Sequence, residues 1–410
     1  MGQARRVLGK PRVWLLYHFM FPDDVVSARH FHELGQGLVA LGWDVTAFPS
    51  NRSCRTAGLA YPVHEFRDGV EYFRIWRPDL KQRGFGSRIF NAVWMIAAWS
   101  FLGPRRRSRA PDVVIIGTDP PLSALSVLLL RIFIPSAKFV HWAFDLHPEA
   151  SIAQGSLSGS GLVSFVLRRL LGFAYRSFDV IVDIGACMRR LLERYDHGVA
   201  VHEITPWALV EPPHASGVSS AVRLELFGRA RLGILYSGSF GEAHDCAPFL
   251  ELGRALRGVP DIKFCFAARG HQADVLKNNV NDTDSNITFA DFAPVGQLED
   301  RLSSADIHLV SLKPGWAGVA VPSKFFGSLA SGRPILYSGP VDSAIAVLIR
   351  EHNVGWVLDA DDIGATALAL RKVMENPEVL INMKTHCHSV YQKMFSRDLM
   401  ISKWDRCLRE

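Results

Sequence analysis

The sequence has little cysteine, and no two cysteines are spaced as a functional pair. The six cysteines are scattered singly through 410 residues, at positions 54, 187, 246, 265, 387 and 407. The absence of a Cys-x-x-Cys pair excludes the usual zinc and redox motifs. Isolated thiols are typical of a reducing compartment. We therefore expect reduced, mostly buried cysteines in a cytoplasmic protein.

The sequence also lacks an apolar run long enough to cross a membrane. The stretches 90–103 and 122–134 fall short of the roughly 20 residues that a span requires, and Arg131 interrupts the second. A run at 13–21 follows a basic start, but it contains His18 and has no small-residue cleavage site after it. We expect a buried strand there rather than a signal peptide, and no transmembrane helix.

Charge of one sign does not dominate the chain, but its distribution is uneven. The net charge is +6; residues 1–209 hold 25 Lys and Arg against 17 Asp and Glu, whereas residues 210–410 hold 21 against 23. A basic first half suits an acidic partner such as phospholipid or a phosphorylated acceptor, although scattered arginines also occur on solvated faces. No basic stripe with interleaved aromatic residues is present, so nucleic acid is not an expected partner.

The sequence does contain a regular alternation of apolar runs and amphipathic segments. The apolar runs predict strands at 12–20, 44–49, 72–76, 113–118, 138–144, 180–184 and 201–205, and then at 232–236, 262–267, 287–289, 307–312, 334–337 and 355–358. Between the two series, residues 206–220 are rich in Pro, Ser and Gly, which predicts a linker.

This alternation predicts an α/β protein with two doubly wound, Rossmann-like domains, because apolar residues at successive strand positions favour parallel sheets covered by helices. We expect the domains at 1–209 and 210–390, with a final helix at 391–410. Ligands of such sheets bind at the carboxyl ends of the strands, so two domains facing each other would form a cleft there.

The stretch Val321-Pro-Ser-Lys324 predicts a loop that leads into a short helix at 324–330, and Ala330-Ser-Gly-Arg-Pro334 then precedes an apolar strand. Ser323 is placed to cap the helix, and Lys324 lies in its first turn. Free N–H groups, the helix dipole and an ammonium group would converge there on an anion such as phosphate. An ordinary strand-loop-helix unit with a surface lysine is the alternative.

The stretch from Val321 to Tyr337 resembles the donor-site segment of retaining glycosyltransferases of family 4. The signature of that family ends in Ala-x-Gly-x-Pro before an apolar strand, here Ala330-Ser-Gly-Arg-Pro334. The Pro-Ser-Lys opening resembles a bacterial subgroup that builds cell-surface polysaccharides. The resemblance implies the GT-B fold, in which the terminal helix returns to the first domain. Most family members have two glutamates eight positions apart before that ending. This chain has Val319 and Gly327 at those positions.

Other strand ends carry further candidates for donor binding. The turn Gly238-Ser239-Phe240-Gly241 resembles the family's donor-pyrophosphate loop, although a plain strand-helix turn has the same pattern. Arg269 at the end of the next strand could hold pyrophosphate oxygens, or could be a surface arginine. Phe292 lies in Asp291-Phe-Ala293, which resembles the loop that holds the nucleobase.

In the first half, His141-Trp-Ala-Phe-Asp-Leu-His-Pro-Glu149 sets four ionisable side chains near a strand end. This stretch resembles the Asp-Leu-x-Pro-Glu segment of the polysaccharide subgroup. We predict Asp145 and His147 as catalytic residues. Strand alternation puts both on one face, together with His141. A metal site is the less favoured interpretation, because related folds hold diphosphate with dipoles and basic residues.

Two further features concern the acceptor. Asp23 and Asp24 follow the first strand and are candidates for binding acceptor hydroxyls, with capping of the next helix by Asp24 or Ser27 as the alternative. An aromatic segment with Trp94 leads into a basic run that ends at Arg109. This pairing predicts contact with an anionic bilayer, or else a solvated loop after a buried helix.

Together the residues and the resemblance predict a retaining glycosyltransferase with a nucleotide sugar, most simply a UDP-sugar, as co-substrate. No metal or other cofactor is expected. The acceptor would be a sugar or a lipid-linked molecule, at the inner face of the membrane if the bilayer contact holds. A nucleotide-sugar epimerase that uses His147 with Asp145 or Glu149 is an alternative, and a non-catalytic partner subunit is another.

Overall fold

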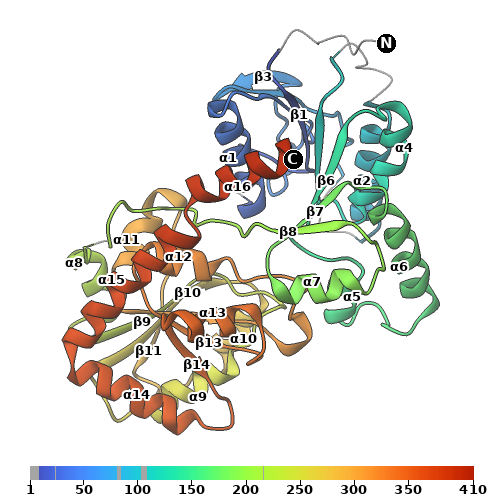
Figure 1. Ribbon diagram of the computed structural model, residues 1–410. Coiled ribbons are helices and arrows are strands. Elements are labelled where there is room, and N and C mark those ends of the chain that lie inside the picture. Colours follow the sequence, from blue (N-terminus) through green and yellow to red (C-terminus); the bar gives the residue numbers. More distant parts are fainter. Residues whose placement is uncertain (1–8, 24, 81–84, 103–108, 216) are drawn as a thin grey trace. The chain divides into compact units, whose positions relative to one another are not determined.

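The computed structural model describes residues 9–23, 25–80, 85–102, 109–215 and 217–410 (Figure 1). The chain divides into two compact units. Unit 1 comprises Met1–Thr205 and Met400–Glu410, and unit 2 comprises Pro206–Leu399. The first division falls at the start of the Pro-rich stretch that predicted a linker. Asp24 and the basic run at 105–107 lie outside the described residues.

Unit 1 is built on one eight-stranded sheet with the strand order β3-β4-β2-β1-β5-β6-β7-β8. Neighbouring strands are parallel, except that β3 and β4 form an antiparallel pair at one edge. The strands are β1 (Arg12–Leu16), β2 (Asp44–Ala47), β3 (His64–Arg67), β4 (Val70–Phe73), β5 (Val113–Gly117), β6 (Lys138–Trp142), β7 (Val180–Asp183) and β8 (Ala200–Glu203). Every residue of β5 is buried, as in a parallel sheet covered on both faces.

The helices of unit 1 lie between strands, as the amphipathic segments between the apolar runs indicated. They are α1 (Val26–Ala40), α2 (Phe85–Ser100), the 3-10 turn η2 (Ser123–Leu125), α4 (Ser126–Phe133), α5 (Glu149–Ala153), α6 (Leu162–Tyr175) and α7 (Ala186–Glu193). The short helix α5 and the strand β3 were not predicted. Three of the four residues of β3 are exposed, so this strand lacks the apolar run that marks the others.

The C-terminal helix α16 (Arg397–Arg409) packs against unit 1 from Met400 onward. The Trp404 ring meets that of Trp142 with centroids 4.8 Å apart, and Lys138 Nζ donates a hydrogen bond of 2.6 Å to the Cys407 carbonyl. The predicted return of this helix is confirmed. It begins later than expected, because Tyr391 lies in α15 (Pro377–Met394) of unit 2 and its hydroxyl accepts a hydrogen bond from the Ala208 backbone N–H at 2.9 Å.

Unit 2 contains a six-stranded parallel sheet with the order β11-β10-β9-β12-β13-β14. The strands are β9 (Leu232–Ser239), β10 (Ile262–Arg269), β11 (Ile287–Phe289), β12 (Ile307–Ser311), β13 (Ile335–Ser338) and β14 (Gly355–Leu358). Each of these strands had been predicted. The expectation of two parallel α/β domains is confirmed.

Helices alternate with these strands throughout unit 2. They are α8 (Ser220–Phe227), α9 (Ala247–Ala255), α10 (His271–Asn279), η3 (Val295–Gln297), α11 (Leu298–Ser303), η4 (Pro314–Trp316), α12 (Lys324–Ala330), α13 (Ala344–His352), α14 (Ile363–Glu375) and α15. Helix α12 buries Phe325, Phe326 and Leu329 in the core beneath it. This packing fixes the start of α12, and therefore Lys324, beside the carboxyl end of the sheet.

Candidate active site

The carboxyl ends of β9 and β10 lie side by side and bring predicted donor-binding residues together. Ser239 is opposite Arg269 in the register of these strands. The Arg269 guanidinium lies over the ring of Phe292, 3.7 Å from its centroid. The Phe292 side chain is itself 38% exposed. A cation and an accessible aromatic ring therefore occupy the edge where ligands of parallel sheets bind.

Lys324 reaches the same edge from the start of α12. Its Nζ donates a hydrogen bond of 2.7 Å to the Ser239 carbonyl and lies 5.0 Å from the centroid of the Tyr236 ring. Gly238 has a φ of 120°, and a Cβ there would come within 3.1 Å of Lys324 Cε, so glycine lets the lysine pass. Burial lowers the pKa of Lys324 to about 8. An ammonium group has three donors, which leaves donors for a phosphate oxygen.

The sequence analysis missed two basic residues near this loop, His244 and Lys313. His244 follows the glycine-rich turn, and its Nδ1 lies 2.7 Å from the Ser311 carbonyl. Burial, and then the charge of Lys324 and finally that of Lys313, lower the pKa of His244 to about 3, so the imidazole is neutral. The charges of Lys324 and Lys313 therefore both act on the His244 ring. The position of His244, directly after the loop, was the signal that could have identified it.

Phe240, one of the predicted donor-binding residues, has a structural role. The Phe240 side chain is fully buried and stacks on Tyr236, while its backbone N–H and carbonyl bond to Arg269 and Gln272. The prediction that Ser323 caps α12 is wrong. Its backbone is already helical, with φ −59° and ψ −19°, and its side chain makes no capping hydrogen bond.

The two positions where most of the family has glutamate offer no carboxylate in this chain. Val319 is 3% exposed. Gly327 lies in α12, and a Cβ there would have Leu302 as its nearest neighbour, at 3.9 Å. Hydroxyl groups of a donor would therefore have to bind elsewhere. Gly241 borders open space, since a Cβ there would meet nothing within 4 Å.

In unit 1, the carboxyl ends of β5 and β6 bring Asp145 close to a second carboxylate. The Asp145 backbone N–H lies 3.4 Å from Thr118 Oγ1, directly after β5. Although Asp145 is exposed by its accessible surface, desolvation by the protein atoms around its carboxyl group, and then repulsion by Asp119, raise its pKa to about 6. Asp119 was not predicted, although it follows an apolar strand as Asp145 does. Its carboxylate lies 3.5 Å from Nδ1 of the buried His18.

A pocket in unit 1 gathers the histidines of the predicted cluster around Asp145. His141, Asp145, His147 and Tyr175 all line it. Strand alternation does not explain this grouping, because β6 ends at Trp142 and Asp145 and His147 lie in the turn that follows. Burial lowers the pKa of His147, against the opposing effect of Asp119, and lowers that of His141 to about 4. Both imidazoles are therefore neutral near pH 7. His141 Nδ1 faces the Ile116 carbonyl at 2.9 Å.

Glu149, the fourth ionisable residue of that stretch, is committed to the fold. It is 8% exposed, it accepts a hydrogen bond of 3.0 Å from Arg168 Nε, and it contacts the Tyr195 hydroxyl. A carboxylate held in this way cannot readily exchange a proton with a substrate. Among the residues proposed for an epimerase, His147 and Asp145 remain in one pocket, whereas Glu149 does not join them.

The predicted acceptor residue Asp23 holds a neighbouring loop. Its Oδ1 accepts hydrogen bonds from Ser53 Oγ at 2.8 Å, from the Cys54 backbone N–H at 3.0 Å and from the Tyr61 hydroxyl at 3.1 Å. The alternative that Ser27 caps α1 is wrong, because the helix begins at Val26 and the capping position is Val25. Asp23 shapes the surface near the carboxyl end of β1.

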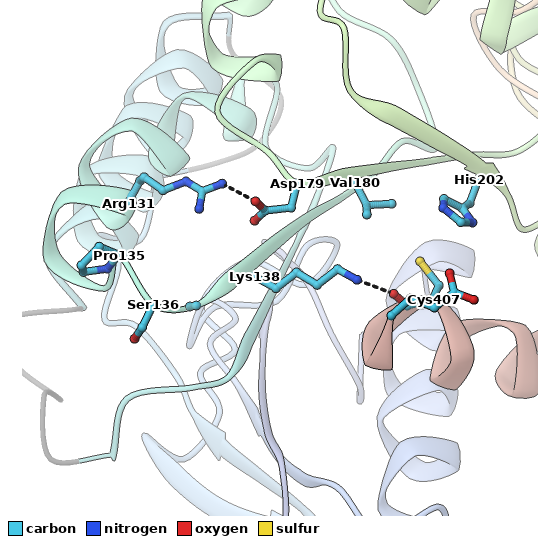
Figure 2. A pocket seen from close by; sticks show the side chains of 10 residues that line it. Arg131, Pro135, Ser136, Lys138, Asp179, Val180, His202 and Cys407 are labelled. Carbon is cyan, nitrogen blue, oxygen red and sulfur yellow. Dashed lines mark hydrogen bonds and ion pairs between the residues drawn. The ribbon is translucent and has the colours of Figure 1, made fainter. Parts of the chain in front are cut away.

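A second pocket of unit 1 lies at the opposite edge of the sheet (Figure 2). Lys138 and Val180, at the amino ends of β6 and β7, line it, and an ion pair of 2.8 Å joins Arg131 to Asp179 there. Ligands of parallel sheets bind at the other edge, so this pocket is not a candidate active site. Within the described ranges, no cluster of His, Cys, Asp and Glu could hold a metal ion.

Comparison with known proteins places the chain among glycosyltransferases. Residues 27–206 match a family model described as a glycosyl transferase 4-like domain. Over 363 residues the chain is 27% identical to the probable glycosyltransferase WbjE of Pseudomonas aeruginosa, covering 86% of this chain and 88% of that protein. It is 22% identical to the putative colanic acid biosynthesis glycosyl transferase WcaI of Escherichia coli, covering 89% and 92%.

A solved structure supports the fold assignment. The catalytic domain of starch synthase IV from Arabidopsis thaliana, bound to ADP and acarbose, matches with a TM-score of 0.68 and 11% identity, covering 98% of this chain and 99% of that one. A match of this kind reports on the fold. The chain therefore has the GT-B fold and contains, at residues 27–206, a glycosyl transferase 4-like domain.

Proposed function

We propose that the protein transfers a sugar from a nucleoside diphosphate sugar to an acceptor hydroxyl with retention of configuration, in the synthesis of a polysaccharide or glycoconjugate. The observation that carries the proposal is the arrangement of Lys324, Ser239 and Arg269 at one sheet edge of unit 2. Two cations and an aromatic ring suit a nucleoside diphosphate. The name of the relative WcaI supports a polysaccharide product.

In this proposal the residues of unit 2 stabilise the leaving group. As the bond to the sugar breaks, negative charge grows on the diphosphate, and the Lys324 ammonium and the Arg269 guanidinium offset it. Phe292 provides a face on which the nucleobase can stack. No protein base is needed for this step, since the leaving phosphate can accept the proton of the acceptor hydroxyl on the same face of the sugar.

Asp145 has the complementary role toward the sugar. Its carboxylate would stabilise the cation-like sugar of the transition state or orient the acceptor hydroxyl. Neutral His147 can donate or accept a hydrogen bond beside it. The reaction proceeds either by transfer on one face or by double displacement through a covalent sugar. The proposed acceptor is a sugar or a lipid-linked molecule on the cytoplasmic side of the membrane.

This role for Asp145 predicts the acid limb of the pH profile. Because the pKa of Asp145 is raised to about 6, the carboxylate is present above that pH and is lost as the pH falls through it. We expect kcat/KM to decline below about pH 6 for this reason. Initial rates across a pH series would measure the decline. Asp145→Asn should show no such limb, and a limb unchanged in that variant would assign it to another group.

A panel of nucleotide sugars tests the proposed function directly. The purified protein is incubated with UDP-, GDP- and ADP-sugars, with and without sugar and lipid-linked acceptors. UDP-sugars are tested first. Acceptor-dependent release of the nucleoside diphosphate supports transfer, and the anomeric configuration of the product tests retention. An isomerised donor would instead indicate an epimerase. Binding of a nucleotide sugar without any reaction would indicate a non-catalytic subunit.

A further inference from the structure

Three helices of unit 1 expose many large apolar side chains to solvent. We refer to these side chains of α2, α4 and α6 as the apolar face. Its members are Ile89, Phe90, Val93, Trp94, Leu129, Ile132, Phe133, Leu162, Val163, Phe165, Val166, Leu170 and Phe173. The exposed fraction reaches 69% for Ile132 and 77% for Leu162. A soluble surface rarely leaves so many large apolar groups in water without a use for them.

The three helices are neighbours. Helix α2 packs against α4, and the short turn η2 contacts α2, α4 and α6. In Figure 1 these helices, drawn in blue-green to green, gather along one side of unit 1. The helices that carry the apolar face are therefore neighbours in the fold rather than scattered over unit 1. In unit 2, by contrast, α15 carries Glu378, Lys384 and Lys393 along with its exposed Ile381.

The charges on these helices have one sign. The sequences of α2, α4 and α6 contain no Asp or Glu, and their charged residues are Arg88, Arg131, Arg168 and Arg169. Arg131 pairs with Asp179 at 2.8 Å and Arg168 with Glu149 at 3.0 Å, whereas Arg88 and Arg169 are exposed. Apolar side chains flanked by arginines, without acids, complement an anionic bilayer surface.

The aromatic residues Phe90 and Trp94 of the apolar face, and Trp76 beside them, fit the same partner. Trp94 Nε1 donates a hydrogen bond of 2.7 Å to the Trp76 carbonyl, and the two rings meet edge to face with centroids 5.5 Å apart. Trp76 is 55% exposed, and Phe90 stacks on Trp94. Tryptophans at the margin of an apolar surface are typical of the boundary between lipid headgroups and acyl chains.

We propose that the apolar face of α2, α4 and α6 inserts into the interface of an anionic lipid bilayer. No helix in the described part of the chain is long and apolar enough to span a membrane, and insertion of this kind needs none. Binding would be driven by burial of apolar area as well as by charge. The inference goes beyond sugar transfer and does not depend on it, because membrane binding can be measured without substrates.

Cosedimentation with lipid vesicles tests the proposal. We expect the protein to bind vesicles of equal parts phosphatidylglycerol and phosphatidylcholine, and to bind phosphatidylcholine alone more weakly. At about 1 M salt the Debye length falls to roughly 3 Å, so attraction between exposed charges is largely screened. It should therefore reduce binding to the mixed vesicles but leave a bound fraction held by apolar burial. Complete release at high salt, or no binding at low salt, would overturn insertion.

Matched isoleucine variants locate the contact. Ile132→Asp places a charge on the apolar face and should weaken vesicle binding at least about tenfold, because in the bound state it replaces an aliphatic side chain in contact with lipid by a carboxylate. Ile381→Asp, on α15 of unit 2, changes an isoleucine that is 61% exposed and should bind as the unaltered protein does. Equal binding by both variants would contradict the proposal.

A second copy of the chain is the competing occupant of the apolar face. If the unaltered protein is dimeric without lipid and Ile132→Asp is monomeric, while both bind vesicles equally, the face is a protein interface and the proposal fails. Circular dichroism and UDP affinity serve as folding controls. Both should be the same in the two variants, because Ile132 and Ile381 lie outside the candidate active site.

Discussion

Replacing Asp145 with asparagine is expected to lower the turnover number by at least about a hundredfold, or roughly 2.7 kcal/mol of activation free energy. Asparagine keeps the size and much of the hydrogen bonding of the side chain but removes its negative charge. That charge stabilises a cation-like sugar more in the transition state than in the ground state. Donor affinity should therefore change little. Initial rates with saturating donor and calorimetric titration of UDP measure the two quantities separately.

Asp44→Asn is the matched control for this variant. Asp44 begins β2 at the amino edge of the same sheet, where it lies 3.7 Å from Arg12. Its replacement should leave turnover unchanged. If Asp145→Asn barely changes turnover, or if donor affinity and melting temperature fall together with it, Asp145 is not catalytic. His147→Gln would then be the next variant to measure, since His147 lines the same pocket.

The fold was predictable because its signal repeats along the sequence. Each central strand is a run of buried apolar residues, as in β5, and each leads into a helix. The elements that were missed have weak signals. Strand β3 is mostly exposed, and α8 follows the Pro- and Gly-rich stretch that predicted a linker. The first residues of the returning helix were misplaced because α15 and α16 are separated only by a short break at Phe395.

The candidate site was predictable in place more than in detail. Parallel strands end at one edge of their own sheet, so polar residues after β9 and β10 could be grouped within unit 2, and those after β6 within unit 1. The groups that each side chain contacts could not be predicted from the sequence. The Asp23 carboxylate accepts hydrogen bonds from the loop at 53–61, and the Phe240 side chain is buried in the core. Asp119 was missed because its relation to Asp145 depends on β5 and β6 being neighbours in the sheet.

Replacing Lys324 with alanine is expected to weaken the affinity for a nucleoside diphosphate by about 1.5–3 kcal/mol, the range for a hydrogen bond to a charged group. This corresponds to a rise in Kd of roughly tenfold to more than a hundredfold. The fold should survive, because the hydrogen bond that is lost goes to the Ser239 carbonyl, in a residue that is itself exposed. Calorimetric titration with UDP measures the affinity.

Two lysine variants separate charge at the phosphate from a general loss of structure. Lys263, near the amino end of β10, also donates from Nζ to a backbone carbonyl, that of Ser285 at 2.6 Å, so Lys263→Ala should bind UDP normally.

The pKa of Lys324 is lowered to about 8, so its charge is lost as the pH rises through that value, and UDP affinity should fall above it. Lys324→Arg keeps its charge there and should abolish this decline. An unchanged Kd in Lys324→Ala would remove Lys324 from the donor site, because a phosphate held by this ammonium cannot lose it without weaker binding.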